Sequence, residues 1–269
     1  MAFDDAPIRN RTDYNGLLAL PYSGWAWEFK RRDSALRRDA RVARTPSPIM
    51  LRREDGSCLI RLPRRSFTAE AHGLHFLPDP AKSALEVTPF WLPDVMTANL
   101  EAAAQIGAAL TKRDEPLRWQ DIPGDKTILM MPQRRPKLVI RTKGYAVQLS
   151  LNAQGAPIPH AIYISVQLGA SQLLRENLRH LEEFVSHCCG AKLNCRPRRG
   201  YSPKTLRDAL IALDGSLEGA SQREIAGRIF GERQASEDWG DGVLSLKSRT
   251  RRLIRKGRAL MESEYLNLL

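Results

Sequence analysis

The sequence contains little cysteine and no long apolar run. Four cysteines occur among 269 residues, at positions 58, 188, 189 and 195. Structural zinc sites use C-x-x-C-like pairs, and an adjacent Cys-Cys does not supply them, so we expect free thiols and no metal. No stretch reaches the length of a membrane-spanning helix, and the first residues, MAFDDAPIRN, lack the apolar core of a signal peptide. These absences exclude a membrane span and predict a cytoplasmic protein.

The motifs of common enzyme classes are also absent. There is no G-x-S-x-G elbow, phosphate-binding loop, H-E-x-x-H or dinucleotide-binding glycine fingerprint. The remaining enzymatic alternative is a DNA-cutting or DNA-rejoining enzyme, which needs clustered carboxylates for a metal or an activated nucleophile such as Tyr265. The carboxylates are scattered, and Tyr265 stands in the apolar tail YLNLL, where it can simply pack. We therefore predict no enzymatic activity, no catalytic residues and no cofactor.

Positive charge, by contrast, is in excess. The chain carries 42 Lys and Arg against 30 Asp and Glu, a net charge of +12 that favours a polyanionic partner. The excess is densest from Leu246 to Arg258, where seven residues are basic and none is acidic. On a helix with about 100° per residue, the apolar positions of this stretch share one arc and the basic ones flank it. A cationic helix face without internal partners needs an external anion, and DNA phosphates supply closely spaced negative charge.

The flanks of this predicted helix hold the main candidates for DNA contact, which are Lys247, Arg249, Arg251, Arg252, Arg255 and Arg258. Gln222 and Arg223 are secondary candidates, because they begin the preceding helix and helix N-termini bind phosphate. One alternative is a solvated face with no partner. Another is a helix that lies on an anionic membrane, which is disfavoured because the apolar face lacks Trp and Phe.

The preceding residues predict the rest of a helical DNA-binding domain. Ser202 and Pro203 begin one helix, and Ser221 with Glu224 has the spacing of a capping box at the start of another. Gly231 can end that second helix. Residues 232–243 separate this second helix from the basic helix. This connection is longer than the turn of three or four residues in a tight helix-turn-helix. We therefore expect a variant trihelical domain and leave open which helix enters the groove.

The rest of the chain predicts an α+β fold with a helical Trp/Arg-rich N-terminal segment and a β-rich middle. A helix is expected from about Ser23 to Ala40, and hairpins around Asp55-Gly56 and Lys143-Gly144. Residues 84–93 resemble a strand and residues 94–110 a helix. Residues 171–189 form an amphipathic helix, with Leu174, Leu178, Leu181 and Val185 on its apolar face. The segment with His72, Gly73 and His75 is expected to be a loop. The expected domains are residues 10–70, 84–195 and 200–269.

Two segments resemble known families. The segment GASQREIAGRIFGERQASEDWGDGVLSLKSRTRRLIRKGRALMESEYLNLL is similar to the C-terminal DNA-binding domain of RovC-like bacterial transcription factors. The N-terminal segment DYNGLLALPYSGWAWEFKRRDSALRRDA resembles the short regulator domain of FseA-type activators of integrative mobile elements. The resemblance implies a transcriptional activator, acting on a mobile element or on secretion genes, that forms a homo-oligomer.

The predicted function is therefore a sequence-specific DNA-binding transcription factor, an activator whose main partner is double-stranded promoter DNA. RNA polymerase and an antiactivator protein are further expected partners. The alternative is a basic protein-protein docking module, in which the Trp-rich N-terminal segment and the basic surface hold an acidic partner. A preference among DNA sequences separates the two, whereas salt dependence alone does not.

Overall fold

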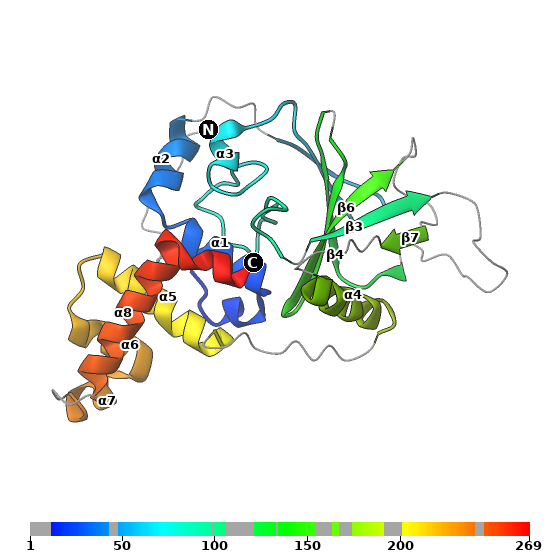
Figure 1. Ribbon diagram of the computed structural model, residues 1–269. Helices are drawn as coiled ribbons and strands as arrows, with labels where there is room; N and C mark the ends of the chain where they lie inside the picture. Colours follow the sequence, from blue (N-terminus) through cyan, green and yellow to red (C-terminus); the bar gives the residue numbers. More distant parts are fainter. Residues whose placement is uncertain are drawn as a thin grey trace. The chain divides into compact units, whose positions relative to one another are not determined.

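A computed structural model describes residues 12–42, 48–97, 99–105, 121–132, 134–153, 163–166, 174–190, 201–239 and 245–269. Contacts divide the chain into two compact units (Figure 1). The first contains residues 1–42, 78–87 and 196–269, and the second contains residues 43–77 and 88–195. The N-terminal segment and the C-terminal helices thus share one unit. The three domains expected from the sequence group the residues differently, and their boundaries stay a prediction. No described helix has the length and apolarity needed to cross a membrane.

All regular elements in the described part of the first unit are helices, and residues 78–87 add a segment of turns. Its elements are η2 (Gly16–Ala19), α1 (Tyr22–Lys30), α2 (Ser34–Val42), α5 (Pro203–Leu217), α6 (Gln222–Phe230), α7 (Glu232–Glu237), α8 (Leu246–Glu262) and η4 (Glu264–Leu268). The expected helix starts are confirmed. The Ser202 side chain caps α5, and Ser221 and Glu224 form both halves of a capping box on α6. Ser245 caps α8 in the same way.

Two helices of this unit differ from the prediction. Gly231 has a φ of 95°, which lets α7 begin directly after α6, so a short extra helix stands between the second and the long helix. The expected helix from Ser23 to Ala40 is two helices. The chain breaks at Asp33, whose carboxylate accepts a hydrogen bond from the Ala35 amide at 2.9 Å. Asp is a favoured residue before a helix, and this local bond starts α2 in a new direction.

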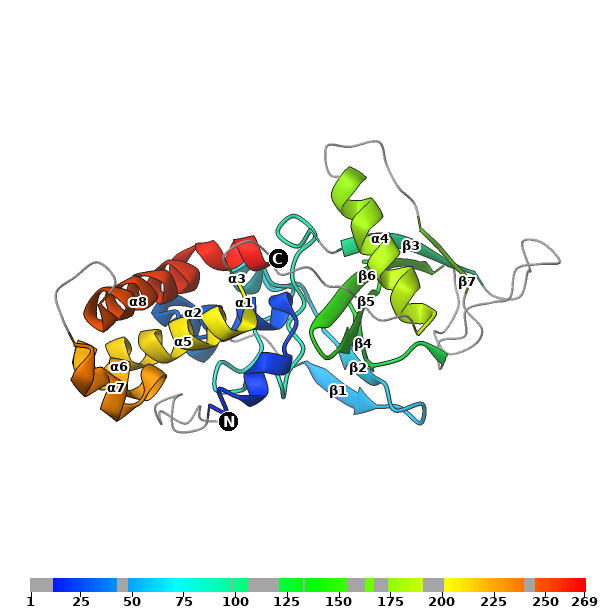
Figure 2. The same ribbon diagram turned by 90° about the horizontal axis from the view of Figure 1, so that it is seen from below.

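Helices α5 and α8 approach closely and lie side by side in both views (Figures 1 and 2). A Cβ atom on Gly257 of α8 would lie 2.6 Å from the Ala209 carbonyl oxygen and 2.9 Å from the Leu213 Cβ. Only glycine therefore fits at this crossing. Leu246, Thr250 and Leu260 complete the buried side of α8, as the periodicity predicts.

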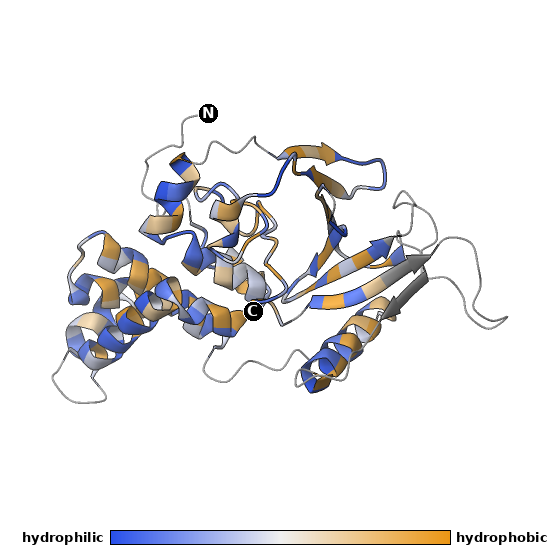
Figure 3. Ribbon diagram, turned by 45° about the horizontal axis from the view of Figure 1, so that its top comes forward, coloured by the Kyte–Doolittle hydropathy of each residue, from blue (hydrophilic) through white to orange (hydrophobic). Residues whose placement is uncertain are grey.

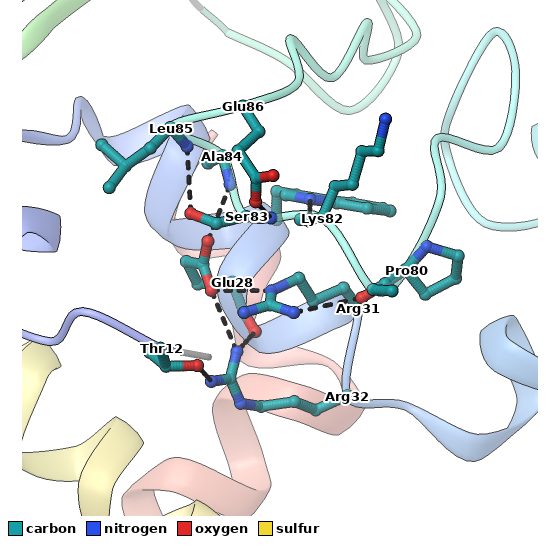
Figure 4. A network of polar contacts seen from close by, with 12 residues as sticks. Thr12, Glu28, Arg31, Arg32, Pro80, Lys82, Ser83, Ala84, Leu85 and Glu86 are labelled. Atoms are coloured by element: carbon teal, nitrogen blue, oxygen red, sulfur yellow. Dashed lines mark hydrogen bonds and ion pairs between the residues drawn. The ribbon is translucent and has the colours of Figure 1, made fainter. Parts of the chain in front are cut away.

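Helix α1 joins this unit through a buried ionic network (Figure 4). Arg32 donates to both Asp214 carboxylate oxygens of α5, at 2.5 and 2.7 Å. Glu28 accepts from Arg31 and Arg32 and from the Ala84 amide. Burial alone would raise the pKa of Glu28, but the two guanidinium groups and the Ala84 amide outweigh it and hold that pKa below its usual value. The N-terminal segment is therefore an internal part of this unit.

The second unit is built on a seven-stranded sheet in the order β1-β2-β4-β5-β6-β3-β7. Its strands are β1 (Ile49–Arg52), β2 (Cys58–Arg61), β3 (Asn99–Gln105), β4 (Asp125–Met130), β5 (Lys137–Thr142), β6 (Tyr145–Ala153) and β7 (Tyr163–Val166). The β2–β4 and β3–β6 pairs are parallel and the others antiparallel. Both expected hairpins are confirmed, with Gly56 and Gly144 at positive φ. Strand β1 is an edge strand, and its apolar residues are exposed. Figure 3 colours the strands by hydropathy.

Two expected elements of the middle region are wrong. Residues 99–105 form strand β3 where a helix was expected over 94–110, of which residues 98 and 106–110 lie outside the described part. Alanine-rich sequence favours a helix locally, but pairing with β6 on one side and β7 on the other overrides that preference. The expected strand over residues 84–93 is a turn followed by irregular chain, with only the isolated bridge between Leu74 and Trp91. Pro89 and Pro93 lack the amide donors that a strand needs.

Short helix α3 (Phe67–Glu70) and helix α4 (Leu174–Cys188) complete the described part of this unit. Phe184 of α4 packs in the core on one sheet face, and Phe76 and Phe90 pack on the residues of the opposite face. The expected apolar face of α4 is confirmed only in part. Leu181 packs against the sheet core, but the buried residues of α4 are His180, Phe184 and His187. Leu178 and Val185 are about half exposed, at 47% and 50%. The sheet core accepts the aromatic side of α4, and the His187 ring also bonds the Pro123 carbonyl at 2.8 Å.

Candidate nucleic-acid interface

The described structure places all six main candidates on α8, on the side away from its buried residues. Arg249, Arg251, Arg252, Arg255 and Arg258 are exposed, and Lys247 is half-buried. The first turn of α8 contains Lys247 and Arg249 and no acidic residue. Cations at a helix N-terminus oppose the helix dipole and are not favoured for stability alone. An anion bound there would be attracted by both the side chains and the positive end of the helix dipole.

These basic side chains differ in how the protein holds them. The Arg249 guanidinium lies over the Phe230 ring of α6, 4.6 Å from its centroid. Arg258 donates to the Ser216 hydroxyl of α5 at 2.9 Å. Both contacts orient the side chain without neutralising its charge.

Three arginines in the middle of the face have side chains without a contact partner among the described residues. Among the residues that the structure describes, Arg251, Arg252 and Arg255 have no hydrogen bond, ion pair or ring contact. Lys256, the seventh basic residue of the stretch, differs because its ammonium lies over the Tyr201 ring, 4.5 Å from the centroid. The face therefore combines two oriented guanidinium groups, three unpartnered ones and Lys247.

The two secondary candidates lie at the start of α6. Arg223 is exposed and donates to the Ser236 hydroxyl of α7 at 3.3 Å. Gln222 is half-buried. The Glu224 carboxylate occupies this helix start, because it accepts from the Ser221 amide at 2.7 Å. Hydrogen bonds from the Ser221 side chain and amide hold the pKa of Glu224 below its usual value, so the carboxylate is charged at neutral pH. A phosphate there would meet this negative charge, so α6 is a weaker anion site than α8.

The residues considered for catalysis have other surroundings. Tyr265 is buried, and burial followed by the nearby Asp33 charge raises the pKa of its hydroxyl, which makes it a poorer nucleophile. Burial raises the pKa of the Cys188 thiol to about 11. Within the described ranges, no group of three or more His, Cys, Asp or Glu side chains could hold a metal ion. Cys195 lies outside the described residues.

The sequence indicated a short turn of helix near Glu237-Asp238-Trp239, but not a helix over Glu232–Glu237 that contacts α6. This helix supplies Ser236, the partner of Arg223, and its own Arg233 pairs with Glu237 at 2.9 Å. The signal for it was present, because Gly231 can start as well as end a helix and ERQASE contains good helix formers. Arg228 was also passed over. It is exposed but pairs with Glu218 at 3.2 Å, so its charge is already balanced.

Comparison with known families identifies the C-terminal part of the chain. Residues 168–269 match the family model RovC DNA-binding domain, described as the DNA-binding domain of a T6SS transcription factor. This match confirms the RovC-like C-terminal domain and supports a DNA-binding transcription factor. It covers α4 and the helices α5 to α8 that carry the basic face. No curated protein matches the chain. The FseA-like resemblance of the N-terminal segment stays a prediction.

Proposed function

We propose that this protein binds promoter DNA in a sequence-specific manner through the basic face of α8, and that it activates transcription. The observation that carries the proposal is the group of Arg251, Arg252 and Arg255, which are exposed and unpartnered in the described structure, within a domain that matches a DNA-binding family. Self-repulsion makes such a face unfavourable without an anion. Duplex DNA removes this repulsion and releases counterions on binding.

The different environments of the side chains favour a division of roles. Arg249 and Arg258 are oriented by Phe230 and Ser216, and fixed cations are suited to phosphate contacts that set the register on the duplex. Arg251, Arg252 and Arg255 can extend from the face, and a free guanidinium can form the two parallel hydrogen bonds that recognise guanine. Lys247 adds a phosphate contact at the helix start, and Gln222 and Arg223 add weaker contacts from α6.

Activation requires further partners. We propose RNA polymerase as one target, an antiactivator as a regulator, and promoters of a mobile element or of secretion genes as the sites of action. Self-association would let the protein read two half-sites. The half-exposed Leu178 and Val185 of α4 offer an apolar surface for a second copy of the chain.

The alternative of a protein docking module loses part of its support. Its aromatic anchors were to come from the N-terminal segment, but Trp25, Trp27 and Phe29 are fully buried. Of the two features on which this alternative depends, the basic face of α8 stays exposed. A docking surface made of charge alone would bind polyanions with little discrimination.

The test is an affinity measurement on DNA from upstream of neighbouring operons, against scrambled duplex, at two salt concentrations. We expect a preference of about a thousandfold for the specific site. The Arg251→Ala/Arg255→Ala variant should bind at least about tenfold more weakly, because each lost contact is worth about 1–3 kcal/mol.

The matched control is Arg233→Ala, in which an exposed arginine of α7 is removed together with its pairing to Glu237. It should bind like wild type. Equal affinity for both duplexes would contradict sequence-specific DNA binding. Wild-type affinity in the double variant would contradict the α8 assignment.

A further inference from the structure

A row of polar side chains crosses three neighbouring strands of the second unit. Lys137 of β5 stands opposite Ser150 of β6, and Gln148 of β6 stands opposite Asn99 of β3. Their sequence neighbours Leu138, Leu149 and Leu100 face the core that contains Phe184 of α4. Because side chains alternate along a strand, the polar row lies on the other sheet face.

Hydrogen bonds connect the row into a chain. The Lys137 ammonium donates to the Ser150 hydroxyl. Ser150 donates to Asn99 Oδ1 at 3.2 Å, and Gln148 Nε2 approaches the same oxygen at 3.3 Å. Gln148 Nε2 also donates to the Trp91 carbonyl at 2.8 Å. The geometry of this face is therefore well defined.

Several polar atoms in or near this row have no partner among the described residues. Lys137 is 8% exposed, and in the described part of the chain its ammonium has no acceptor besides Ser150. Within the described ranges, Gln148 Oε1 is buried without a donor, and both ring nitrogens of His75 are buried without a partner. The His75 amide donates to the Phe90 carbonyl beside Trp91, which brings this histidine to the same region. Buried polar groups are normally satisfied, so unmet donors and acceptors at one place indicate a missing ligand.

The local charge is also unbalanced. Glu70 is engaged by Arg65 and Arg134, and Glu101 is engaged by Arg135. No described carboxylate is left within ion-pair distance of Lys137. A buried cation without a counter-charge is costly.

The titration behaviour agrees with this imbalance. Burial is the main cause that lowers the pKa of Lys137, with Arg135 and Arg134 adding to it against Glu101. Burial, Lys137 and Arg134 lower the pKa of His75 to about 4. His75 is therefore neutral at pH 7, with one nitrogen that can donate a hydrogen bond.

We propose that Lys137, His75 and Gln148 form a binding site for a small oxyanion, the carboxylate or phosphate group of a metabolite. The anion accepts hydrogen bonds from the two remaining N–H groups of Lys137 and from neutral His75. A hydroxyl or amino group on the same ligand donates to Gln148 Oε1. The low exposure of Lys137 keeps a DNA backbone out, so this site is separate from α8 and does not rest on the proposed DNA binding.

The test measures oxyanion binding by calorimetry, with inorganic phosphate and with malonate as probes at constant ionic strength. The full chain carries Arg251→Ala and Arg255→Ala as background, which weakens anion binding at the α8 face. In this background we expect saturable binding of phosphate, malonate or both, at one site per chain. Binding of phosphate alone identifies a phosphate ligand, and binding of malonate alone identifies a carboxylate.

Lys137→Met added to this background should weaken binding about tenfold or more, because a charged hydrogen-bonding group is lost. Lys137→Gln is the second variant, because glutamine keeps a hydrogen bond to Ser150 and removes only the charge. It replaces Lys137→Met if the methionine variant fails to fold. Retained cooperative thermal unfolding of the variant shows that the fold is intact. The proposal is wrong if neither probe binds, or if either folded Lys137 variant binds both probes as tightly as its background.

Discussion

Two arginine-rich stretches of the first unit have similar sequences and opposite surroundings. In α1 and the residues after it, KRRDSALRRDAR, Arg31 and Arg32 are buried and paired with Glu28 and Asp214. In α8, KSRTRRLIRKGR, Arg251 and Arg255 are exposed and unpartnered among the described residues. Acidic residues make the difference, because the first stretch meets carboxylates of α1 and α5. Arginines can therefore hold a fold together or remain available for an external anion.

The largest expected effect is the loss of stability when one of the two buried arginines is removed. Arg32→Ala should destabilise the protein by about 3–5 kcal/mol, because it leaves the Asp214 carboxylate buried without its cation. Urea unfolding measures this loss of stability. It can be monitored by the fluorescence of Trp25 and Trp27, which are buried in α1.

The control is Arg38→Ala on α2, whose side chain is 71% exposed. Its effect should stay within about 0.5 kcal/mol. Equal unfolding midpoints for the two variants would show that the network contributes nothing to stability.

A second substitution probes the buried side of α8. Gly257→Ala should cost about 1–3 kcal/mol, because the new Cβ would lie 2.6 Å from the Ala209 carbonyl oxygen and α8 would have to move. Thermal unfolding measures the loss.

Gly227→Ala is the matched glycine control in α6. The three atoms nearest its Cβ would belong to the flexible Glu232 side chain, and alanine favours helix, so the change should be below about 1 kcal/mol. If Gly227→Ala were the more harmful of the two, the close crossing of α5 and α8 would not limit this position.

A third measurement tests whether the exposed arginines of α8 contact DNA. Arg258→Ala should reduce the slope of log affinity against log salt by about 1, because one phosphate contact is lost. Fluorescence anisotropy on a labelled duplex measures this slope. Arg37→Ala on α2 should leave it unchanged. A drop of the same size in both would extend the DNA-binding surface to α2 and end the contrast between the two stretches.

The smallest expected effect is the dependence of stability on acidic pH that comes from Glu28. The folded-state pKa of Glu28 is lowered, so its charge stabilises the fold above the ordinary carboxyl pKa of 4.5, and this contribution is lost as pH falls below it. Glu28→Gln should therefore be less stable than wild type at pH 7, and the gap should narrow toward acid. Unfolding midpoints at several pH values measure it, with Glu237→Gln as the exposed control. A gap that stays constant with pH would contradict the charged state of Glu28.

Local signals predicted the part of the fold that carries the candidate site. The caps at Ser202 and Ser221 depend on bonds within one turn of helix, and the apolar arc of α8 depends only on helix geometry. The assignment of residues 94–110 as helix failed because strand β3 depends on partners distant in the chain. The buried face of α4 was right only in part for a similar reason. Leu178 and Val185 lie outside the core that contains Phe184 and the partly buried Leu181, and only the sheet decides which side of α4 is covered.

The sequence by itself determined that α8 is an amphipathic helix with a cationic face, because periodicity and charge are local properties. It also determined the capped helices before α8 and the resemblance that the family match confirmed. Only the tertiary structure decided which arginines are neutralised. Arg32 and Asp214 are 182 positions apart and meet through folding, whereas no described residue pairs with Arg251. The same holds for Lys137, whose position beside Ser150, Asn99 and Gln148 follows from strand register.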